Sequence, residues 1–243
     1  MPARPSSIAP LRYPRLTPPR RARRWPWLIV LALVAAAVYV TLRPKLWPVP
    51  PAPTTAPRRP LVGIIAGHRE FDSGAVCDDG LREVDITTEV TRQVLDRLHA
   101  RGYEAEMLSE YDDRLAGYRA AALVSLHVDS CMFDLSGYKV AGSSHGPAAR
   151  DSALLVEALS GAYAAATGLG FHADTITVDM TNYHAFQRID PRTPAAIIEM
   201  GFMSGDRTLL VAHSDQAARG IADGVLAFLS AKAEEQRTPT PSN

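Results

Sequence analysis

The first 69 residues contain no aspartate or glutamate, and this absence divides the chain into two parts. Eleven Lys and Arg lie within the first 59 residues, so the remainder keeps fifteen basic and all 26 acidic residues, a net charge of −11. The overall net charge of zero conceals this division. We therefore expect a basic leader followed by an acidic folded part, whose charge argues against nucleic acid as a partner.

Residues 25–42 lack any charged side chain. As a helix, this segment would extend about 27 Å, near the lower limit for crossing a bilayer. Because seven arginines precede it, we expect a basic cytoplasmic leader at 1–24, a transmembrane signal-anchor at 25–42 and an extracytoplasmic remainder in a single-pass protein of the cell membrane. The alternative is a cleaved signal peptide, but no clear small-x-small cleavage site precedes Thr41.

No internal repeat is present, and the two ends of the chain have biased compositions. Seven prolines between residues 43 and 60 predict an extended linker that could reach roughly 50 Å and hold a domain away from the membrane. The polar residues 232–243 predict a disordered tail. One domain is left at residues 61–231, which is enough for a single core.

Within this domain, short apolar runs alternate with helical patterns. We predict strands at 61–66, 104–108, 121–126, 138–141, 175–178 and 195–198, of which 61–66 is a continuous apolar run suited to a buried strand. The periodic segments predict helices at 82–101, 114–120, 148–166 and 216–231. The alternation favours an α/β three-layer sandwich with a mostly parallel sheet flanked by helices, preceded by the transmembrane helix.

Metal-competent side chains follow the ends of these apolar runs. His68, His127 and Glu199 each end one run, and Glu83 opens a helical pattern. In open α/β sheets, the carboxyl ends of the strands form the site. Two imidazoles and one carboxylate leave the fourth tetrahedral position of Zn²⁺ open to water, and a second glutamate can take a proton from that water. We therefore predict His68, Glu83 and His127 as zinc ligands, with Glu199 as the acid/base.

Only two cysteines occur, and each follows a predicted ligand. Cys77 lies nine positions after His68, and Cys131 lies four positions after His127. If the strand ends meet, the cysteines can meet too, and a disulfide is permitted outside the membrane. Two buried free thiols are the second interpretation, and thiolate ligation of the metal is the third.

Four motifs in this order resemble the zinc-dependent N-acetylmuramoyl-L-alanine amidases of the bacterial cell wall. The motifs are Ile65-Ala66-Gly67-His68 followed by Asp72-Ser73-Gly74-Ala75, Glu83 at a helix start, Ser125-Leu126-His127-Val128-Asp129, and Ile198-Glu199-Met200-Gly201-Phe202-Met203-Ser204. The resemblance implies an α/β sheet, zinc held by His68, Glu83 and His127, catalysis by Glu199, and hydrolysis of the muramic acid–L-alanine amide of peptidoglycan. It leaves the oligomeric state open.

The chain departs from the family pattern at several positions. Ala66 stands where the family has proline, charged Arg69-Glu70 follows the first histidine, and Gly205 replaces an asparagine. Arg188 is nearest to an arginine that precedes the last strand in the family, although its register differs by about one residue. We therefore name Arg188, and His184 as a residue that could line the cleft, as candidate substrate-binding residues.

Some family members insert a long helical segment after the second histidine, and this segment covers the site. Only about twenty residues separate His127 from the helix predicted at 148. We therefore expect an open site that needs no activator to uncover it.

Two other functions compete with the amidase. Gly142-Ser143-Ser144-His145-Gly146 fits the G-x-S-x-G motif of serine hydrolases, with Ser144, Asp190 and His213 in a permitted triad order. Its preceding strand is short and amphipathic, which argues against a nucleophile elbow. The second alternative is a peptidoglycan-binding module without catalysis, for which Glu199 would not be required.

Overall fold

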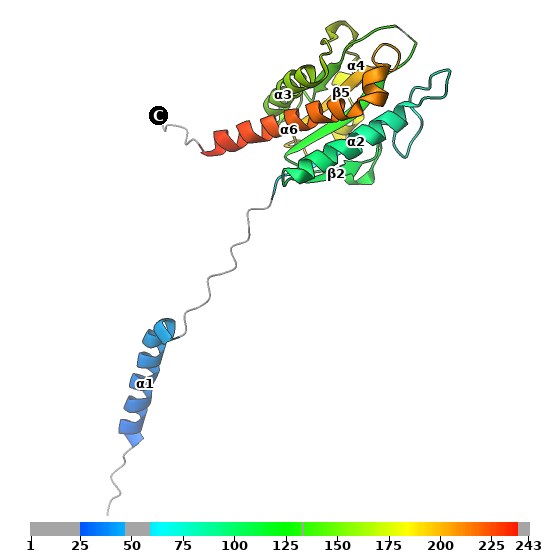
Figure 1. Cartoon of the computed structure of the whole chain (residues 1–243). Helices are drawn as coiled ribbons and strands as arrows, with labels where there is room; N and C mark the ends of the chain where they lie inside the picture. Colours follow the sequence, from blue (N-terminus) through cyan, green and yellow to red (C-terminus); the bar gives the residue numbers. More distant parts are fainter. Residues whose placement is uncertain (1–24, 47–58, 133, 238–243) are drawn as a thin grey trace, which may run out of the picture. The chain divides into compact units, whose positions relative to one another are not determined.

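The computed structural model describes residues 25–46, 59–132 and 134–237 (Figure 1). The chain divides into two compact units, Met1–Ala56 and Pro57–Asn243. The predicted leader at 1–24, most of the predicted linker and residues 238–243 of the predicted tail lie outside the described residues.

In the first unit, the helix α1 (Trp25–Leu46) covers the predicted anchor and continues four residues into the predicted linker. Its described apolar side chains are exposed, among them Leu28, Leu31 and Val34. Over the part of the chain that the structure describes, no helix meets the length and apolarity required of a membrane span.

The second unit is built on a five-stranded sheet in the order β2-β1-β3-β5-β4. Its strands are β1 (Leu61–Ala66), β2 (Glu104–Leu108), β3 (Ala122–Asp129), β4 (Lys139–Gly142) and β5 (Ala195–Phe202). The first four strands in this order pair in parallel, and only the edge strand β4 is antiparallel. The prediction of an α/β fold with a mostly parallel sheet is therefore confirmed.

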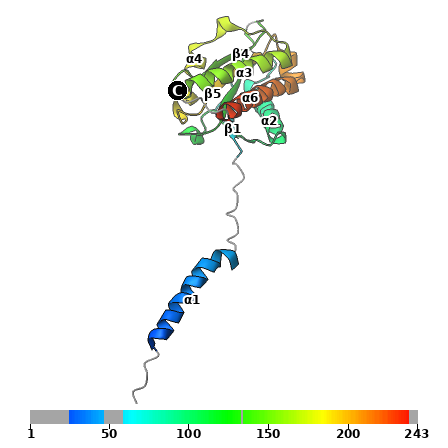
Figure 2. The ribbon, with the colours of Figure 1, turned by 90° about the vertical axis from the view of Figure 1, so that its left-hand side faces the viewer.

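Three long helices cover one face of the sheet, namely α2 (Glu83–Ala100), α3 (Ala149–Thr167) and α6 (Ser214–Arg237). In α2, Val90, Val94 and Leu98 recur at helical spacing and are fully buried. α3 and α6 lie side by side in both ribbon views (Figures 1 and 2). The larger hydrophobic core lies between these helices and the sheet.

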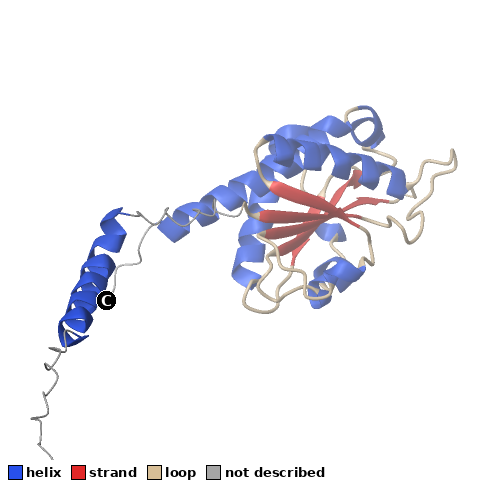
Figure 3. Ribbon diagram, turned by 90° about the horizontal axis from the view of Figure 1, so that it is seen from below, coloured by secondary structure: helices blue, strands red, loops and turns tan. Residues whose placement is uncertain are grey.

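The opposite face carries short elements and a smaller core (Figure 3). These elements include the 3₁₀ turn η1 (Asp113–Leu115), α4 (Val178–Thr181) and α5 (His184–Arg188). Ile65 and Leu108 of the sheet pack with Met180 and Tyr183 in this core. The 3₁₀ turn η2 (Ala173–Thr175) precedes α4, and the π-helical turn η3 (Thr208–Ala212) precedes α6.

Three predicted elements differ in the structure. The predicted strand at 175–178 is a turn leading into α4, because the Thr177 side chain accepts the N–H of Met180 and caps that helix. The predicted helix at 114–120 is only the turn η1. Residues 232–237 of the predicted disordered tail are helical, and Lys232 pairs with Asp151 of α3 and with Glu235.

Candidate metal centre

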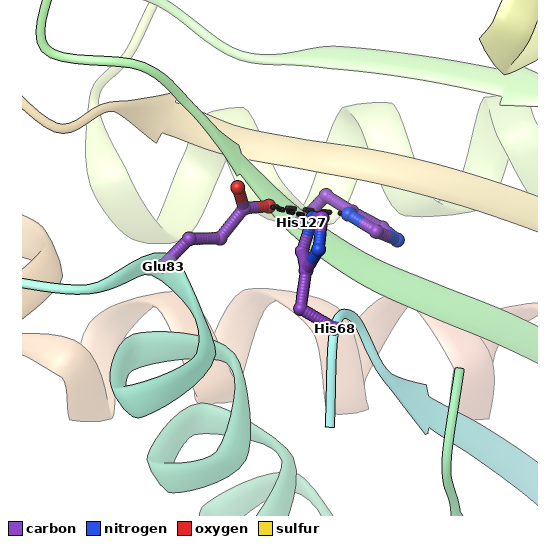
Figure 4. Close-up of side chains that lie close together, drawn as sticks. All are labelled: His68, Glu83 and His127. Carbon is purple, nitrogen blue, oxygen red and sulfur yellow. Dashed lines mark hydrogen bonds and ion pairs between the residues drawn. The ribbon is translucent and has the colours of Figure 1, made fainter. Parts of the chain in front are cut away.

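Three side chains from separate elements converge beyond the carboxyl ends of the central strands (Figure 4). His68 follows β1, His127 lies near the end of β3, and Glu83 is the first residue of α2. Glu83 Oε1 lies 3.3 Å from His68 Nε2 and 3.1 Å from His127 Nδ1. One carboxylate oxygen is therefore shared by two imidazole nitrogens.

The backbone around His68 is unusual. His68 has a φ of 67°, in the left-handed region that costs a non-glycine residue energy. Its Nδ1 lies 2.5 Å from Asp72 Oδ1, which leaves Nε2 to face Glu83. Asp72 Oδ1 also accepts the N–H of Gly74 at 2.9 Å, so this residue both closes the loop and orients the histidine.

Gly74 explains why the loop can pass so close to the ligands. Its φ is +60°, and an added Cβ would lie 2.7 Å from Glu83 Oε2 and 2.8 Å from the His68 ring. Any side chain at this position would therefore meet two of the three converging residues.

Glu83 is held as a buried anion. Its Oε2 accepts the N–H of Ala75, and its Oε1 accepts the N–H of Val128, which lies where the β3–β5 register shifts. Burial alone would raise the pKa of this carboxyl group, but hydrogen bonds with His127 and His68 hold its pKa at about 2. The hydrogen bond that His68 donates to the Glu83 carboxylate raises the pKa of His68 to about 9, against the opposing effect of burial.

The geometry of the three donors fits a tetrahedral zinc ion. Their ligand atoms all lie within 4.8 Å of one another. A tetrahedron with bonds of about 2.0–2.1 Å has edges of roughly 3.3–3.4 Å, close to the two measured separations from Glu83 Oε1. Two imidazoles and one carboxylate are also the donor set of a catalytic zinc site with an open fourth position.

Glu199 lies one strand away from His127. The two residues are register partners in the parallel β3–β5 pair, so their side chains project from the same face of the sheet on strands roughly 4.8 Å apart. The Oε2 atom of Glu199 is buried and has no hydrogen-bond partner among the described residues. Burial raises the pKa of Glu199 to about 7, so this carboxyl group can hold or release a proton near neutral pH.

On its other side, Glu199 pairs in register with Lys139 of β4. Lys139 is 2 % exposed, lies 2.7 Å from Asp129 Oδ2 and donates to the Thr175 carbonyl. Asp129 is therefore occupied by a buried ion pair and, unlike Asp72, does not orient a histidine. Sequence reasoning did not identify Lys139, because a lone lysine in an edge strand looks like a solvent-exposed residue.

A second carboxylate, Glu110, was also missed. It is 5 % exposed and accepts the backbone N–H of His68 at 2.8 Å. Its Oε2 lies 3.5 Å from His127 Nε2, and its Oε1 is 2.8 Å from both the Tyr183 hydroxyl and His184 Nε2. Glu110 follows β2 by two residues, so the rule that strand ends carry the site would have found it.

The two candidate substrate-binding residues have different positions. His184 lies beside the metal centre through its contact with Glu110 and stacks on Tyr111. Arg188 lies at the end of α5, where its carbonyl oxygen accepts the N–H of Gly117. Among the described contacts, its side chain has no ion pair with the converging residues.

The two cysteines form a disulfide between Cys77 and Cys131. Cys77 lies in the loop that leads to Glu83, and Cys131 follows the end of β3, which carries His127. The described chain contains no free cysteine. The disulfide therefore joins the two segments that present Glu83 and His127.

The serine-hydrolase motif lies elsewhere. Ser144 follows β4, which runs antiparallel to its neighbour, so the motif lies at the sheet edge opposite the metal centre. Ser144 Oγ approaches only its neighbour His145, at 3.3 Å, among the described hydrogen bonds. The Asp190 side chain is held by Arg192. The structure does not assemble Ser144, Asp190 and His213 into a triad.

Solved structures with a similar fold include N-acetylmuramoyl-L-alanine amidases. The amidase AmiC2 of Nostoc punctiforme is 26% identical with a TM-score of 0.53, and the match covers 70% of this chain and 97% of that one. An amidase from Clostridium difficile 630 is 18% identical with a TM-score of 0.59, covering 72% and 99%. The CwlD amidase of Clostridioides difficile, solved in complex with the GerS lipoprotein, is 17% identical with a TM-score of 0.56, covering 71% and 100%.

No curated protein has a significant sequence match to this chain. Residues 62–231 match the family of N-acetylmuramoyl-L-alanine amidases of the amidase-3 type, which is most of the chain and nearly all of the second unit. The residues of the metal centre and Glu199 all lie within that match. The chain therefore belongs to the N-acetylmuramoyl-L-alanine amidase family and is a peptidoglycan amidase.

Proposed function

We propose that the chain hydrolyses the amide between N-acetylmuramic acid and L-alanine with Zn²⁺ held by His68, Glu83 and His127, and with Glu199 as the acid/base. The observation that carries the proposal is the convergence of three nitrogen and oxygen donors beside an unpartnered buried carboxylate oxygen. When bound, zinc polarises the carbonyl and lowers the pKa of its water to around 7.

The chain's own residues supply the proton transfers and the positioning. Glu199 accepts the proton of the attacking water and passes it to the departing amine of L-alanine. A carboxyl group with a pKa of about 7 is suited to both steps at neutral pH. Asp72 fixes the orientation of His68, and the backbone N–H groups of Ala75 and Val128 fix Glu83.

The test is a comparison of Glu199→Gln with the wild-type chain on purified peptidoglycan. We expect Glu199→Gln to lower kcat by about 10²–10⁴-fold while its zinc content stays unchanged, because the amide side chain cannot accept a proton. Glu157→Gln, an exposed change on α3, is the matched control. Mass spectrometry of the products would show free L-alanine amino termini and intact lactyl groups.

The same experiment separates catalysis from binding. A peptidoglycan-binding module would release no product from the wild-type chain, and its binding would not depend on Glu199. A chelator should abolish wild-type activity, whereas a serine-directed sulfonyl fluoride should leave it intact. Full activity after complete metal removal would contradict the proposal.

We also propose that residues 25–42 anchor the chain in the cell membrane, with the leader cytoplasmic and the amidase domain outside. The support is the uncharged segment, the seven arginines before it and the prolines after it. The disulfide between Cys77 and Cys131 is in keeping with an oxidising compartment outside the cytoplasm.

Finally, we propose that the site works without an activator. In the described residues between β3 and α3, the regular structure is the strand β4, and there is no helix there that could cover the centre. The purified chain should therefore cleave peptidoglycan without added protein.

A further inference from the structure

A series of aromatic rings leads outward from the metal centre. The ring of His127 meets Tyr183 edge-on at a centroid distance of 5.7 Å, and Tyr183 lies 4.4 Å from His184. His184 stacks on Tyr111 at 4.2 Å with an interplanar angle of 22°, and Tyr111 meets Phe71 at 4.6 Å. The rings therefore connect a proposed zinc ligand with the surface.

The exposure of these rings increases along the series. Tyr183 is 7% exposed, whereas Tyr111 and Phe71 are 48% and 62% exposed. Folded proteins bury most of their large aromatic side chains, so an exposed aromatic group beside an active site points to a binding surface. Phe71 also lines an open hollow together with Asp72, the partner of His68.

The aromatic rings are fixed to the metal centre by Glu110. This carboxylate accepts from Tyr183 and contacts His184, and the next residue in the chain is Tyr111. The main chain of Phe71 is also fixed to the metal centre, because its N–H donates to the carbonyl of His68. A surface that is already ordered loses little conformational entropy when it binds a ligand.

We propose that Phe71, Tyr111 and His184 form a saccharide subsite, here named the aromatic wall, that binds a pyranose ring of the glycan next to the scissile amide. This inference rests on the amidase function, whose substrate carries a sugar on one side of that bond and a peptide on the other. The C–H face of a pyranose is apolar and slightly positive, and it complements the negative faces of aromatic rings. The stem peptide carries carboxylates, for which the three rings offer no cation. Arg82, which lines the same hollow as Phe71, is held by the Asp85 carboxylate.

The experiment compares two substrates of the full-length chain. One is a disaccharide-peptide from peptidoglycan, and the other is an N-lactoyl-peptide that keeps the scissile amide but lacks the sugar ring. We expect the double variant Phe71→Ala/Tyr111→Ala to lose about tenfold in kcat/KM on the disaccharide-peptide, mainly through KM. Its kcat/KM on the N-lactoyl-peptide should stay at the wild-type value.

A further variant serves as the reference. Val178→Ala removes an apolar side chain that is 77% exposed in α4, outside the aromatic wall, and should change neither rate. An equal loss on both substrates would overturn the proposal, because the rings would then only support the metal centre. No loss on either substrate would overturn it as well.

A binding measurement separates this proposal from the proposed catalysis. Calorimetry with the peptide-free disaccharide should show binding to Glu199→Gln and about tenfold weaker binding when Phe71→Ala/Tyr111→Ala is added. Equal affinity with and without the two rings would contradict the subsite even if hydrolysis follows the expected mechanism. If the wild-type chain cleaves neither substrate, the catalytic proposal fails, and the disaccharide titration still decides the subsite.

Discussion

Glu110 is the carboxylate that contacts both histidines of the metal centre from outside the proposed ligand set. It accepts the backbone N–H of His68 and faces the far ring nitrogen of His127, so one carboxylate contacts the main chain of one histidine and the imidazole of the other. Burial would raise the pKa of Glu110, but His184, His127 and the other groups that contact it lower that pKa to about 2. Carboxylates behind metal-binding histidines fix the ring orientation and the tautomer. Glu110 also stabilises the left-handed backbone of His68, which would otherwise be strained.

At this scale we predict that Glu110→Gln weakens zinc binding about 10–100-fold, because the amide is a poorer acceptor for both histidines. Competition with a chromogenic chelator would measure the affinity directly. Glu106→Gln is the matched control, since Glu106 lies on the same segment but pairs with Arg114 and Tyr118. Equal zinc affinity in all three proteins would show that Glu110 has no such role.

At the scale of elements, the loops at the carboxyl edge of the sheet are closed by side-chain contacts of two kinds, a capped turn and a disulfide. Asp112 accepts the N–H groups of Arg114 and Ser109, and its carboxylate pairs with the Arg114 side chain. These contacts close the turn η1 directly after Glu110 and Tyr111. The turn therefore sets the position of residues that reach the metal centre.

This turn should make the stability of the domain depend on pH. Arg114 and the backbone N–H groups lower the pKa of Asp112 to about 2, below its unfolded value near 3.9. The contribution of ionised Asp112 to the free energy of unfolding is therefore fully present above pH 4 and is lost as the pH falls towards 2. We expect Asp112→Asn to lower the free energy of unfolding by about 1 kcal/mol at pH 7. Urea unfolding at several pH values should show that this difference shrinks in acid.

The disulfide is the second contact that closes these loops. Cys77 and Cys131 are 54 positions apart in sequence, so their bond closes a long loop that contains α2, β2 and the whole of β3. By the chain-entropy estimate for a loop of this length, removing it by Cys77→Ser/Cys131→Ser should cost about 4 kcal/mol of unfolding free energy. Denaturant unfolding would measure this loss, and Ser130→Ala is a control beside it that keeps the bond. An unchanged unfolding midpoint would show that the disulfide adds no further restriction to the unfolded chain.

At the scale of the whole molecule, the chain consists of two compact units, to which we assign different tasks. The second unit contains the complete sheet, both cores and the metal centre, so the residues of the amidase site come from residues 61–202 alone. The proposed task of the first unit is to hold the enzyme at the membrane. The two tasks can be separated by deleting one unit.

We predict that a chain beginning at residue 59 is released from the membrane fraction but keeps its amidase activity and its unfolding midpoint. Arg59 should be kept, because its guanidinium donates to the carbonyl of Gly102 at 2.6 Å. Replacing Leu31 and Val34 by lysine in the full chain should also prevent anchoring, because charge at the centre of a membrane helix is costly. A soluble full-length chain, or a mature protein that lacks residues 1–42, would refute the anchor.

Some of the structure could be predicted because it depends on local patterns. The strands predicted at Leu61–Ala66 and Glu104–Leu108 match β1 and β2 to the residue, and the first of them is an apolar run of the length that favours a buried strand. The segment at 175–178 was wrongly predicted as a strand, because the capping contact of Thr177 outweighs its β-branched composition. The end of α6 was missed because the ion pairs of Lys232 and Glu235 with α3 extend a polar helix.

The sequence by itself determined the mostly parallel sheet and the order of the motifs, and it predicted His68, Glu83, His127 and Glu199 as site residues, because each stands at the end of a local pattern. Only the tertiary structure decided which other side chains join them. Lys139, Tyr111 and Phe71 lie beside the site through strand pairing and ring contacts between distant segments. Such contacts depend on how the sheet is assembled, and no periodicity in the chain records them.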